Sequence, residues 1–256
     1  MKKISDIEQA RAMSGLRIVT ITNVPSPWGE ALRGFVRIKG LDHTAVRIAP
    51  GLPLDALQAW TAQASFPVAA WNDERPRSQW NDQLYLVERL KPAPALIPSR
   101  VEDRILMFGL SNEICGENGF GWARRLMMIH PALSSGQKSA FAEYLGPKYG
   151  YSREAAEAAP VRVASIMNAL SAQLAKQKRA DSRFFIGGSI SALDVYWATF
   201  AALVKPLANE LCPMSPGFRA SYTTDDPTVV AAMNPILFEH RDFIYREYLE
   251  LPVDLS

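Results

Sequence analysis

Short apolar runs, separated by residues typical of turns, fill positions 16–90. Residues 16–22 are rich in β-branched side chains and run into an Asn-Val-Pro-Ser-Pro stretch, whose prolines lack backbone donors, so the sequence predicts a strand and then a loop. Residues 28–38 carry apolar side chains at three- and four-residue spacing and precede Gly40, which predicts a helix. The same reasoning predicts further elements at 44–48 (strand), 54–62 (helix), 68–71 (strand), 77–80 (strand) and 82–90 (helix).

The predicted order β-α-β-α-β-β-α favours a sheet with helices on both faces. The residues at 72–74 are typical of the turn between two hairpin strands, here the last two. Three prolines within residues 91–99 then indicate an extended linker. We therefore expect a first domain at 16–90, a linker at 91–99 and a second domain at 100–256.

The second half of the chain lacks the alternation that strands show. One amphipathic helix is predicted by a stripe of apolar residues: Val163, Ile166, Met167, Leu170 and Leu174. Residues 191–211 predict a mostly apolar helix, and Asp226-Pro227 supplies the cap and first-turn proline of another. The sequence thus predicts an all-helical bundle of five to seven helices after an α/β domain.

Charge and composition narrow the classes of partner. The chain has 28 basic and 26 acidic residues without a long basic cluster, so we expect no nucleic-acid partner. Its start is charged, and its most apolar tract ends at Lys205-Pro206, far short of the roughly 20 residues of a spanning helix, so we expect neither secretion nor a membrane span. Two distant cysteines and three scattered histidines predict a reduced, cytoplasmic protein without a metal site.

The sharpest local signal follows Gly187-Gly188. Ser191 and Asp194 have the spacing of a capping box, in which each side chain satisfies a backbone amide of the other residue. Ile190 and Val195 flank them as a hydrophobic staple. These four residues predict the start of a helix and by themselves indicate no catalysis.

This glycine, capping box and staple, placed in an apolar helix of a helical domain, resemble the C-terminal half of the cytosolic glutathione transferases. Ser26-Pro27-Trp28 resembles the strand-to-helix turn of bacterial members with a serine at this turn, and Phe66-Pro67-Val68 resembles their cis-proline turn. The stretch at 80–84 stands where the family has an acidic residue and then a serine, with Gln83 in place of that serine. The resemblance covers roughly residues 16–235; residues 1–15 and the tail from 234 lie outside the usual core.

The resemblance implies a thioredoxin-like domain that binds glutathione as co-substrate, without metal, followed by an all-helical domain with an apolar second-substrate site. It implies a homodimer, with a small apolar electrophile as the other partner. The side chains expected near that electrophile are Trp28, Met107, Phe108 and Trp122. We expect Arg33, Arg124 and Arg125 to lie on solvated helix faces.

Ser26 is the candidate catalytic residue. A free thiol has a pKa of about 8.5, and lowering it by about two units requires roughly 2.7 kcal/mol. A hydrogen bond to a charged sulfur contributes about 1.5 to 3 kcal/mol and a helix N-terminus about 0.3 to 1 kcal/mol, which together suffice. The alternatives are that Ser26 only caps the helix, or that Asn23 or Trp28 contacts the sulfur.

Two further turns are candidate glutathione contacts. If the bond before Pro67 is cis, Val68 would turn its amide and carbonyl outward to pair with a peptide ligand; otherwise a trans proline opens an edge strand. Asp82 and Gln83 open a helix, whose amides attract a carboxylate while Asp82 accepts from an α-amine; otherwise Asp82 is only a first-turn acid.

Two functions therefore remain open. The first is an enzyme in which Ser26 keeps the sulfur of glutathione ionised for attack on an electrophile. The second is a binding or interaction module of the same fold without turnover, which the departure at Gln83 motivates.

Overall fold

The computed structural model describes residues 2–256, which form two compact units. The first unit comprises the chain up to Leu96 together with residues 208–214 and 245–256, and the second comprises residues 97–207 and 215–244. The expected boundary near 91–99 thus lies between Leu96 and Ile97. Two segments of the expected second domain, by contrast, belong to the first unit.

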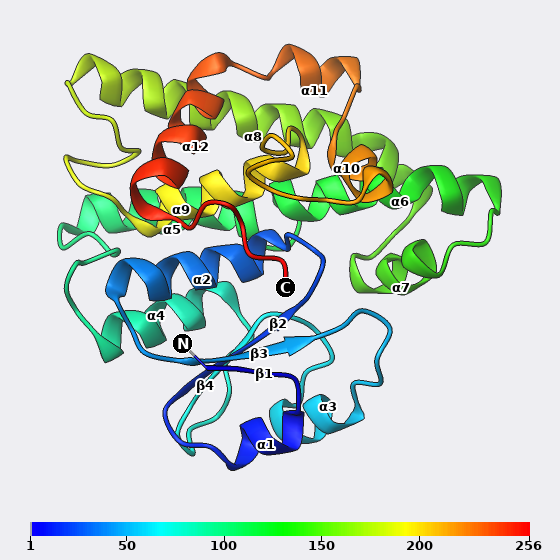
Figure 1. Ribbon diagram of the computed structural model, residues 1–256. Coiled ribbons are helices and arrows are strands. Elements are labelled where there is room, and N and C mark those ends of the chain that lie inside the picture. Colours follow the sequence, from blue (N-terminus) through cyan, green and yellow to red (C-terminus); the bar gives the residue numbers. More distant parts are fainter. Residues whose placement is uncertain (1) are drawn as a thin grey trace. The chain divides into compact units, whose positions relative to one another are not determined.

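The first unit is built on a four-stranded sheet with the order β1-β3-β2-β4 (Figure 1). Its strands are β1 (Lys2–Ile4), β2 (Leu16–Ile21), β3 (Thr44–Ile48) and β4 (Val68–Trp71). The first three are parallel and β4 is antiparallel to β2, with Val19 opposite both Val46 and Val68. The β-α-β unit and the antiparallel strand confirm the thioredoxin-like arrangement, enlarged at one edge by β1.

Helices cover both faces of this sheet, as its parallel strands require. In Figure 1, α2 (Pro27–Lys39) and α4 (Trp80–Leu90) lie on one side, and α1 (Ile7–Ala12) and α3 (Asp55–Thr61) lie on the other. The side that faces α1 and α3 encloses a buried cluster that includes Ala10, Val19, Val46, Leu57 and Val68. Alternation along β2, β3 and β4 places these valines on one face.

One predicted strand of the first unit is wrong. Residues 77–80 form a single bridge, in which Arg77 exchanges two backbone hydrogen bonds with Ala69, and α4 already begins at Trp80. Pro76 offers no backbone donor and the helix takes Trp80, so too few residues remain for a strand. The lead at 1–15, expected only as an extension, supplies β1 and α1.

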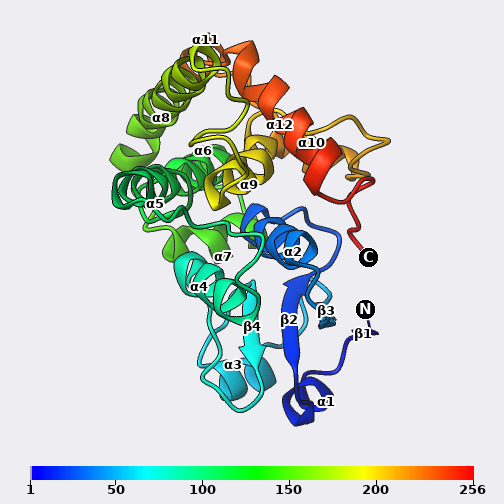
Figure 2. The ribbon, with the colours of Figure 1, turned by 90° about the vertical axis from the view of Figure 1, so that its left-hand side faces the viewer.

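The regular elements of the second unit are all helices in the part of the chain that the structure describes (Figure 2). Its elements are α5 (Val101–Cys115), α6 (Phe120–Ser135), α7 (Ala140–Lys148), α8 (Arg153–Arg179), α9 (Ala192–Phe200), the 3-10 helix Ala201–Leu203, α10 (Pro216–Tyr222), α11 (Pro227–Ala231) and most of α12 (Pro235–Tyr248). The described chain therefore has eight α-helices here, more than the five to seven expected. The predicted helix at 191–211 is wrong in length, because it ends before Pro206.

Two helix predictions for this unit are confirmed. The five apolar residues of the α8 stripe are all buried. Asp226 accepts from the amides of Thr228 and Val229 and so caps α11. Among the residues that the structure describes, no helix is long and apolar enough to cross a membrane. Cys115 of this unit and Cys212 of the first unit are both buried and form no disulfide.

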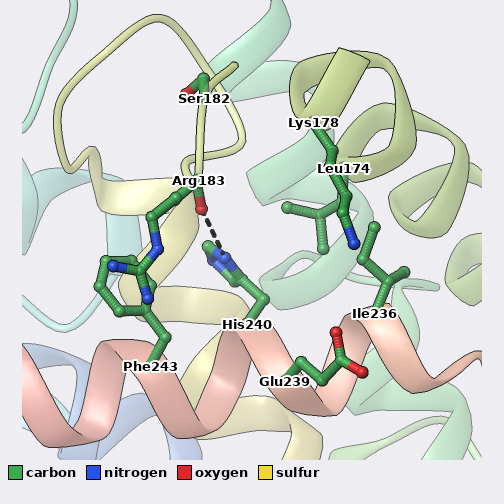
Figure 3. A pocket seen from close by; sticks show the side chains of 8 residues that line it. All are labelled: Leu174, Lys178, Ser182, Arg183, Ile236, Glu239, His240 and Phe243. Carbon is green, nitrogen blue, oxygen red and sulfur yellow. Dashed lines mark hydrogen bonds between the residues drawn. The ribbon is translucent and has the colours of Figure 1, made fainter. Parts of the chain in front are cut away.

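The capping box holds the start of α9. Asp194, which is fully buried, accepts from the Ser191 amide at 2.8 Å, from the Ser191 hydroxyl at 2.7 Å and from the Phe185 amide at 2.8 Å. Nε2 of His240, in α12, lies 3.1 Å from the same carboxylate. Nδ1 of this histidine lies 3.0 Å from the Arg183 carbonyl (Figure 3). Asp194 thus joins α9, α12 and the loop before α9.

We predict that Asp194→Ala lowers the free energy of unfolding by about 2 to 4 kcal/mol, because it leaves buried donors without an acceptor. Urea unfolding measures this directly. Asp226→Ala is the matched control: it removes an aspartate cap from a more accessible helix start and should cost about 0.5 to 2 kcal/mol. Equal losses in the two variants would contradict the role assigned to Asp194.

Candidate functional site

The turn between β2 and α2 carries the candidate catalytic residue. Ser26 is the N-cap of α2 by position, and its carbonyl accepts from the Glu30 amide at 2.8 Å. Its half-buried side chain makes no capping hydrogen bond, although Pro27 at the first helical position would allow one to the amides of the next two residues. The capping role considered for the Ser26 hydroxyl is therefore wrong.

The other two residues considered for this turn differ in placement. Asn23 is exposed and adopts a left-handed φ of 60°, a conformation that asparagine tolerates better than most residues. The backbone N–H of Asn23 donates to the carbonyl of Leu255 at 2.7 Å. Trp28 is half-buried in the first turn of α2. The chain end at 254–256 thus lies against the turn.

A carboxylate of this chain end gathers three cations of the first unit. Asp254 Oδ2 lies 2.8 Å from Lys3 Nζ, 3.2 Å from Arg47 Nη2 and 3.8 Å from Arg33 Nη2. Its carbonyl also accepts from Arg33 Nη1 at 2.6 Å. We call these residues, with Glu30 and Glu250, the Asp254 cluster; it joins β1, β3, α2 and the tail.

Arg33 is buried by the Asp254 cluster. The guanidinium was expected on a solvated helix face, but its side chain is only 13% exposed and forms ion pairs with Glu30 at 2.8 Å and Glu250 at 3.0 Å. That expectation is wrong, because a carboxylate more than 200 positions away in sequence covers the helix. Burial raises the pKa of Glu30, and the adjacent Arg33 opposes that rise.

The cis-proline turn is present. The peptide bond between Phe66 and Pro67 is cis, as expected. The backbone groups of Val68, however, do not point outward as expected. The amide and carbonyl of Ala69 bond to Arg77 on the outer edge of β4. Because these groups alternate in direction along a strand, the amide and carbonyl of Val68 point toward β2. The residue before the proline, Phe66, precedes the ladder between β2 and β4.

Gln83 has a different role from the expected one. Its side chain is 3% exposed, and its amide nitrogen donates to the Pro67 carbonyl at 2.9 Å and to the Arg77 carbonyl at 3.1 Å. Both protons of the amide are thus engaged by the backbone. Gln83 fastens the cis-proline turn to α4, whereas Asp82, one position earlier, is exposed in the first turn of that helix.

Topology brings these turns to one end of the sheet. Ser26 follows β2, and Pro67 precedes its antiparallel neighbour β4, so both lie at the carboxyl end of β2. The hydrogen bonds of Gln83 bring the start of α4 to the same place. Ser26, Pro67, Asp82 and Gln83 therefore belong to one edge of the first unit.

Trp28, one of the four side chains expected at the second-substrate site, belongs to the first unit, and the other three belong to the second. Met107 is fully buried and accepts from the Ser111 hydroxyl at 3.6 Å, so its assignment to an open substrate wall is wrong. Phe108 and Trp122 are half-buried, and Trp122 Nε1 donates to the Tyr149 carbonyl at 2.9 Å.

Two arginines of α6 were also misplaced by sequence reasoning. Arg124 and Arg125 are buried, not solvated. Arg124 donates to the Leu203 carbonyl at 2.7 Å, and Arg125 donates to the Tyr222 hydroxyl at 3.1 Å. Burial, together with the charge of Arg125, lowers the pKa of nearby Lys148 to about 8. In the part of the chain that the structure describes, no three His, Cys, Asp or Glu side chains are grouped as a metal site.

Comparisons with known proteins agree on the fold. No protein-family model and no curated protein matches the sequence. Among solved structures, similar ones include a glutathione S-transferase from Xanthobacter autotrophicus Py2 (TM-score 0.60, 13% identity, 94% of this chain and 98% of that one) and one from Methylobacterium radiotolerans in complex with glutathione sulfonate (TM-score 0.59, 15% identity, 91% and 92%). A rice enzyme of this kind in complex with glutathione gives a TM-score of 0.58 at 18% identity over 93% of each chain.

The chain has the glutathione transferase fold. At these identities the likeness extends to the backbone arrangement and not to individual side chains. The Asp254 cluster and the hydrogen bonds of Gln83 are not predicted by any local sequence motif. They are recognised only from the contacts in the folded structure.

We predict that Asp254→Asn lowers the free energy of unfolding at pH 7 by about 1 to 2 kcal/mol. Partial burial raises the pKa of Asp254, but hydrogen bonds from Lys3 and Ser256 and the charge of Arg47 outweigh it and hold the pKa well below its ordinary value. Because the folded pKa is the lower one, the stabilisation is present above the ordinary value of about 3.9 and is lost as the pH falls below it.

Urea unfolding of both proteins between pH 7 and pH 3 tests this expectation. The difference between wild type and Asp254→Asn should shrink below about pH 4. Asp242→Asn, an exposed aspartate that pairs with its neighbour Arg241, serves as control and should change little. A difference that stays constant with pH would show that the charge of Asp254 is not the cause.

Proposed function

We propose that the protein is a glutathione transferase-like enzyme of the cytoplasm. Glutathione binds as co-substrate at the carboxyl end of β2, and its thiolate attacks a small apolar electrophile. The observation that carries the proposal is Ser26: it lies in the turn between β2 and α2, at the start of α2, with a hydroxyl that the helix does not use as a cap. The glutathione complexes of similar folds support this assignment.

Ser26 acts on the sulfur by hydrogen bonding. Its hydroxyl donates to the thiolate, and the N-terminus of the 13-residue helix α2 adds a favourable field. These two contributions, about 1.5 to 3 and about 0.3 to 1 kcal/mol, lower the thiol pKa by one to two units or more. A bound thiol is then largely ionised near neutral pH, which makes it a stronger nucleophile.

The peptide part of glutathione pairs with the cis-proline turn. Because the amide and carbonyl of Val68 point toward β2, we assign this contact to Phe66, which lies beyond the paired residues of β4. The ligand would add there as a short strand. The exposed carboxylate of Asp82 then accepts from the α-amine of the ligand, and the first turn of α4 receives its carboxylate. Gln83 contributes by holding this turn in place.

A second candidate function is a binding or interaction module without turnover. The observation that favours it is the buried side chain of Gln83, whose donors are engaged by Pro67 and Arg77 and do not reach a ligand. Calorimetry separates the two functions. The enzyme should release or absorb heat with millimolar glutathione, whereas a folded module with a lost site should show none.

We predict that Ser26→Ala reduces turnover near pH 7 about ten-fold or more, with recovery as the pH rises, because loss of the hydrogen bond raises the thiol pKa. Stability should change by less than about 0.5 kcal/mol, since the hydroxyl does not cap α2. The measurement is the ultraviolet absorbance of the bound thiolate against pH, together with the rate on activated aryl halides and alkenes.

Ser139→Ala is the matched control for this experiment. Its hydroxyl accepts from the Ala142 amide at 3.3 Å and caps α7, so the substitution should lower stability and leave the pH profile of the thiolate unchanged. Coincident profiles for wild type and Ser26→Ala would assign the sulfur contact to Asn23, Trp28 or a backbone amide of the same turn.

We also predict a homodimer, since closed two-fold assemblies are the commonest oligomers of soluble proteins and the resembled family pairs in this way. Sedimentation equilibrium at micromolar concentration should give about twice the chain mass of 28.4 kDa. A mass equal to that of one chain would contradict this part of the proposal.

A further inference from the structure

A pocket opens near the start of β2, at the opposite end of the strand from Ser26. It lies between the link from α1 to β2 and the loop from β4 to α4, has a volume of about 370 Å³, and includes Arg11, Arg17, Trp60, Asp73 and Arg75 in its lining. Because Arg17 is the second residue of β2 and Ser26 follows the end of the strand at Ile21, the strand separates the two places by about 13 Å. A volume of this size is typical of small-molecule sites.

The buried cation of this pocket is Arg17, whose residue is 1% exposed. Its Nη1 donates to the Gly15 carbonyl at 2.7 Å and its Nη2 to the Asn72 carbonyl at 2.8 Å. Its Nε is buried without a hydrogen-bond partner, and the hydrogen bonds of its Nη atoms go to neutral carbonyls. A buried charge with neutral partners and a spare donor is unusual and favours an anionic ligand.

The lining of the pocket limits the charge of that ligand. The lining contains three arginines and two acidic residues, Asp73 and Glu74. Glu74 already forms ion pairs with Arg77 at 2.8 Å and with Arg89 at 2.6 Å. Asp73 remains, and its charge acts on Arg17. The pocket therefore carries a modest positive excess, which suits one negative charge better than the two or three of a phosphate.

Trp60 indicates the rest of the ligand. Its half-buried ring lies 5.6 Å from the Arg17 guanidinium carbon, measured to the ring centroid, and Met13 and Pro76 complete an apolar wall. A planar carboxylate matches the fork of donors on arginine, and an aromatic ring packs well beside indole. We propose that this pocket binds a small aromatic carboxylate, with its carboxylate at Arg17 and its ring beside Trp60.

Calorimetry with benzoate as probe tests the proposal on the full-length protein. Benzoate should bind with a dissociation constant in the millimolar range or tighter, and benzamide, the neutral analogue of the same shape, should bind about ten-fold more weakly or not at all. Ser26→Ala should leave benzoate binding unchanged, because that residue lies at the other end of β2. Loss of binding in Ser26→Ala would place the probe at the proposed glutathione site and overturn the proposal.

Variants of the rim keep the test independent of folding. Arg17→Gln should abolish binding, but Arg17 also ties two loops together, so two exposed charges provide the decisive variants. Asp73→Asn should tighten benzoate binding about two- to five-fold, and Arg75→Gln should weaken it by a similar factor. Arg100→Gln, an exposed arginine of the second unit, should have no effect. No heat with about 10 mM benzoate, equal binding of benzamide, or identical affinities in Asp73→Asn and Arg75→Gln would each overturn the proposal.

Discussion

The carboxylate of Asp254 is the contact on which the first unit depends most. Arg33 and Arg47 are largely buried, and two buried guanidinium groups close together require an anion. Asp254 of the tail supplies it, so that β1, β3 and α2 are joined by one group. The same segment accepts the Asn23 amide through Leu255 and thereby reaches the turn that carries Ser26.

Sequence reasoning succeeded where the information is local. The β-branched run of β2, the three- and four-residue spacing of α2 and the Ser191–Asp194 capping box each lie within a few neighbouring residues. The cis peptide bond before Pro67 was predicted from the resemblance to a family and not from local sequence, because an X-Pro bond is cis in only about 5 to 6% of cases.

Several errors of sequence reasoning concern contacts between distant parts of the chain. Arg33 was predicted to be solvated, but Glu250 and Asp254, which are 217 and 221 positions away in sequence, bind its guanidinium. Arg124 and Arg125 find carbonyl and phenol partners up to 97 positions away. The outward face of Val68 was misassigned because the bridge between Ala69 and Arg77, which sets the direction of its backbone groups, replaces the expected strand. Gln83 carries no signal for its buried bonds to Pro67 and Arg77.

The most direct test of this account is hydrogen exchange at two adjacent amides. Asn23 donates to Leu255 of the tail, whereas Thr22 donates to Ile48 of β3 at 2.9 Å. Asp254→Asn should speed exchange at Asn23 about ten-fold, the equivalent of about 1.4 kcal/mol, and leave Thr22 near its wild-type rate. Unchanged exchange at Asn23, or equal acceleration at both amides, would contradict the claim that the Asp254 cluster holds the Ser26 turn.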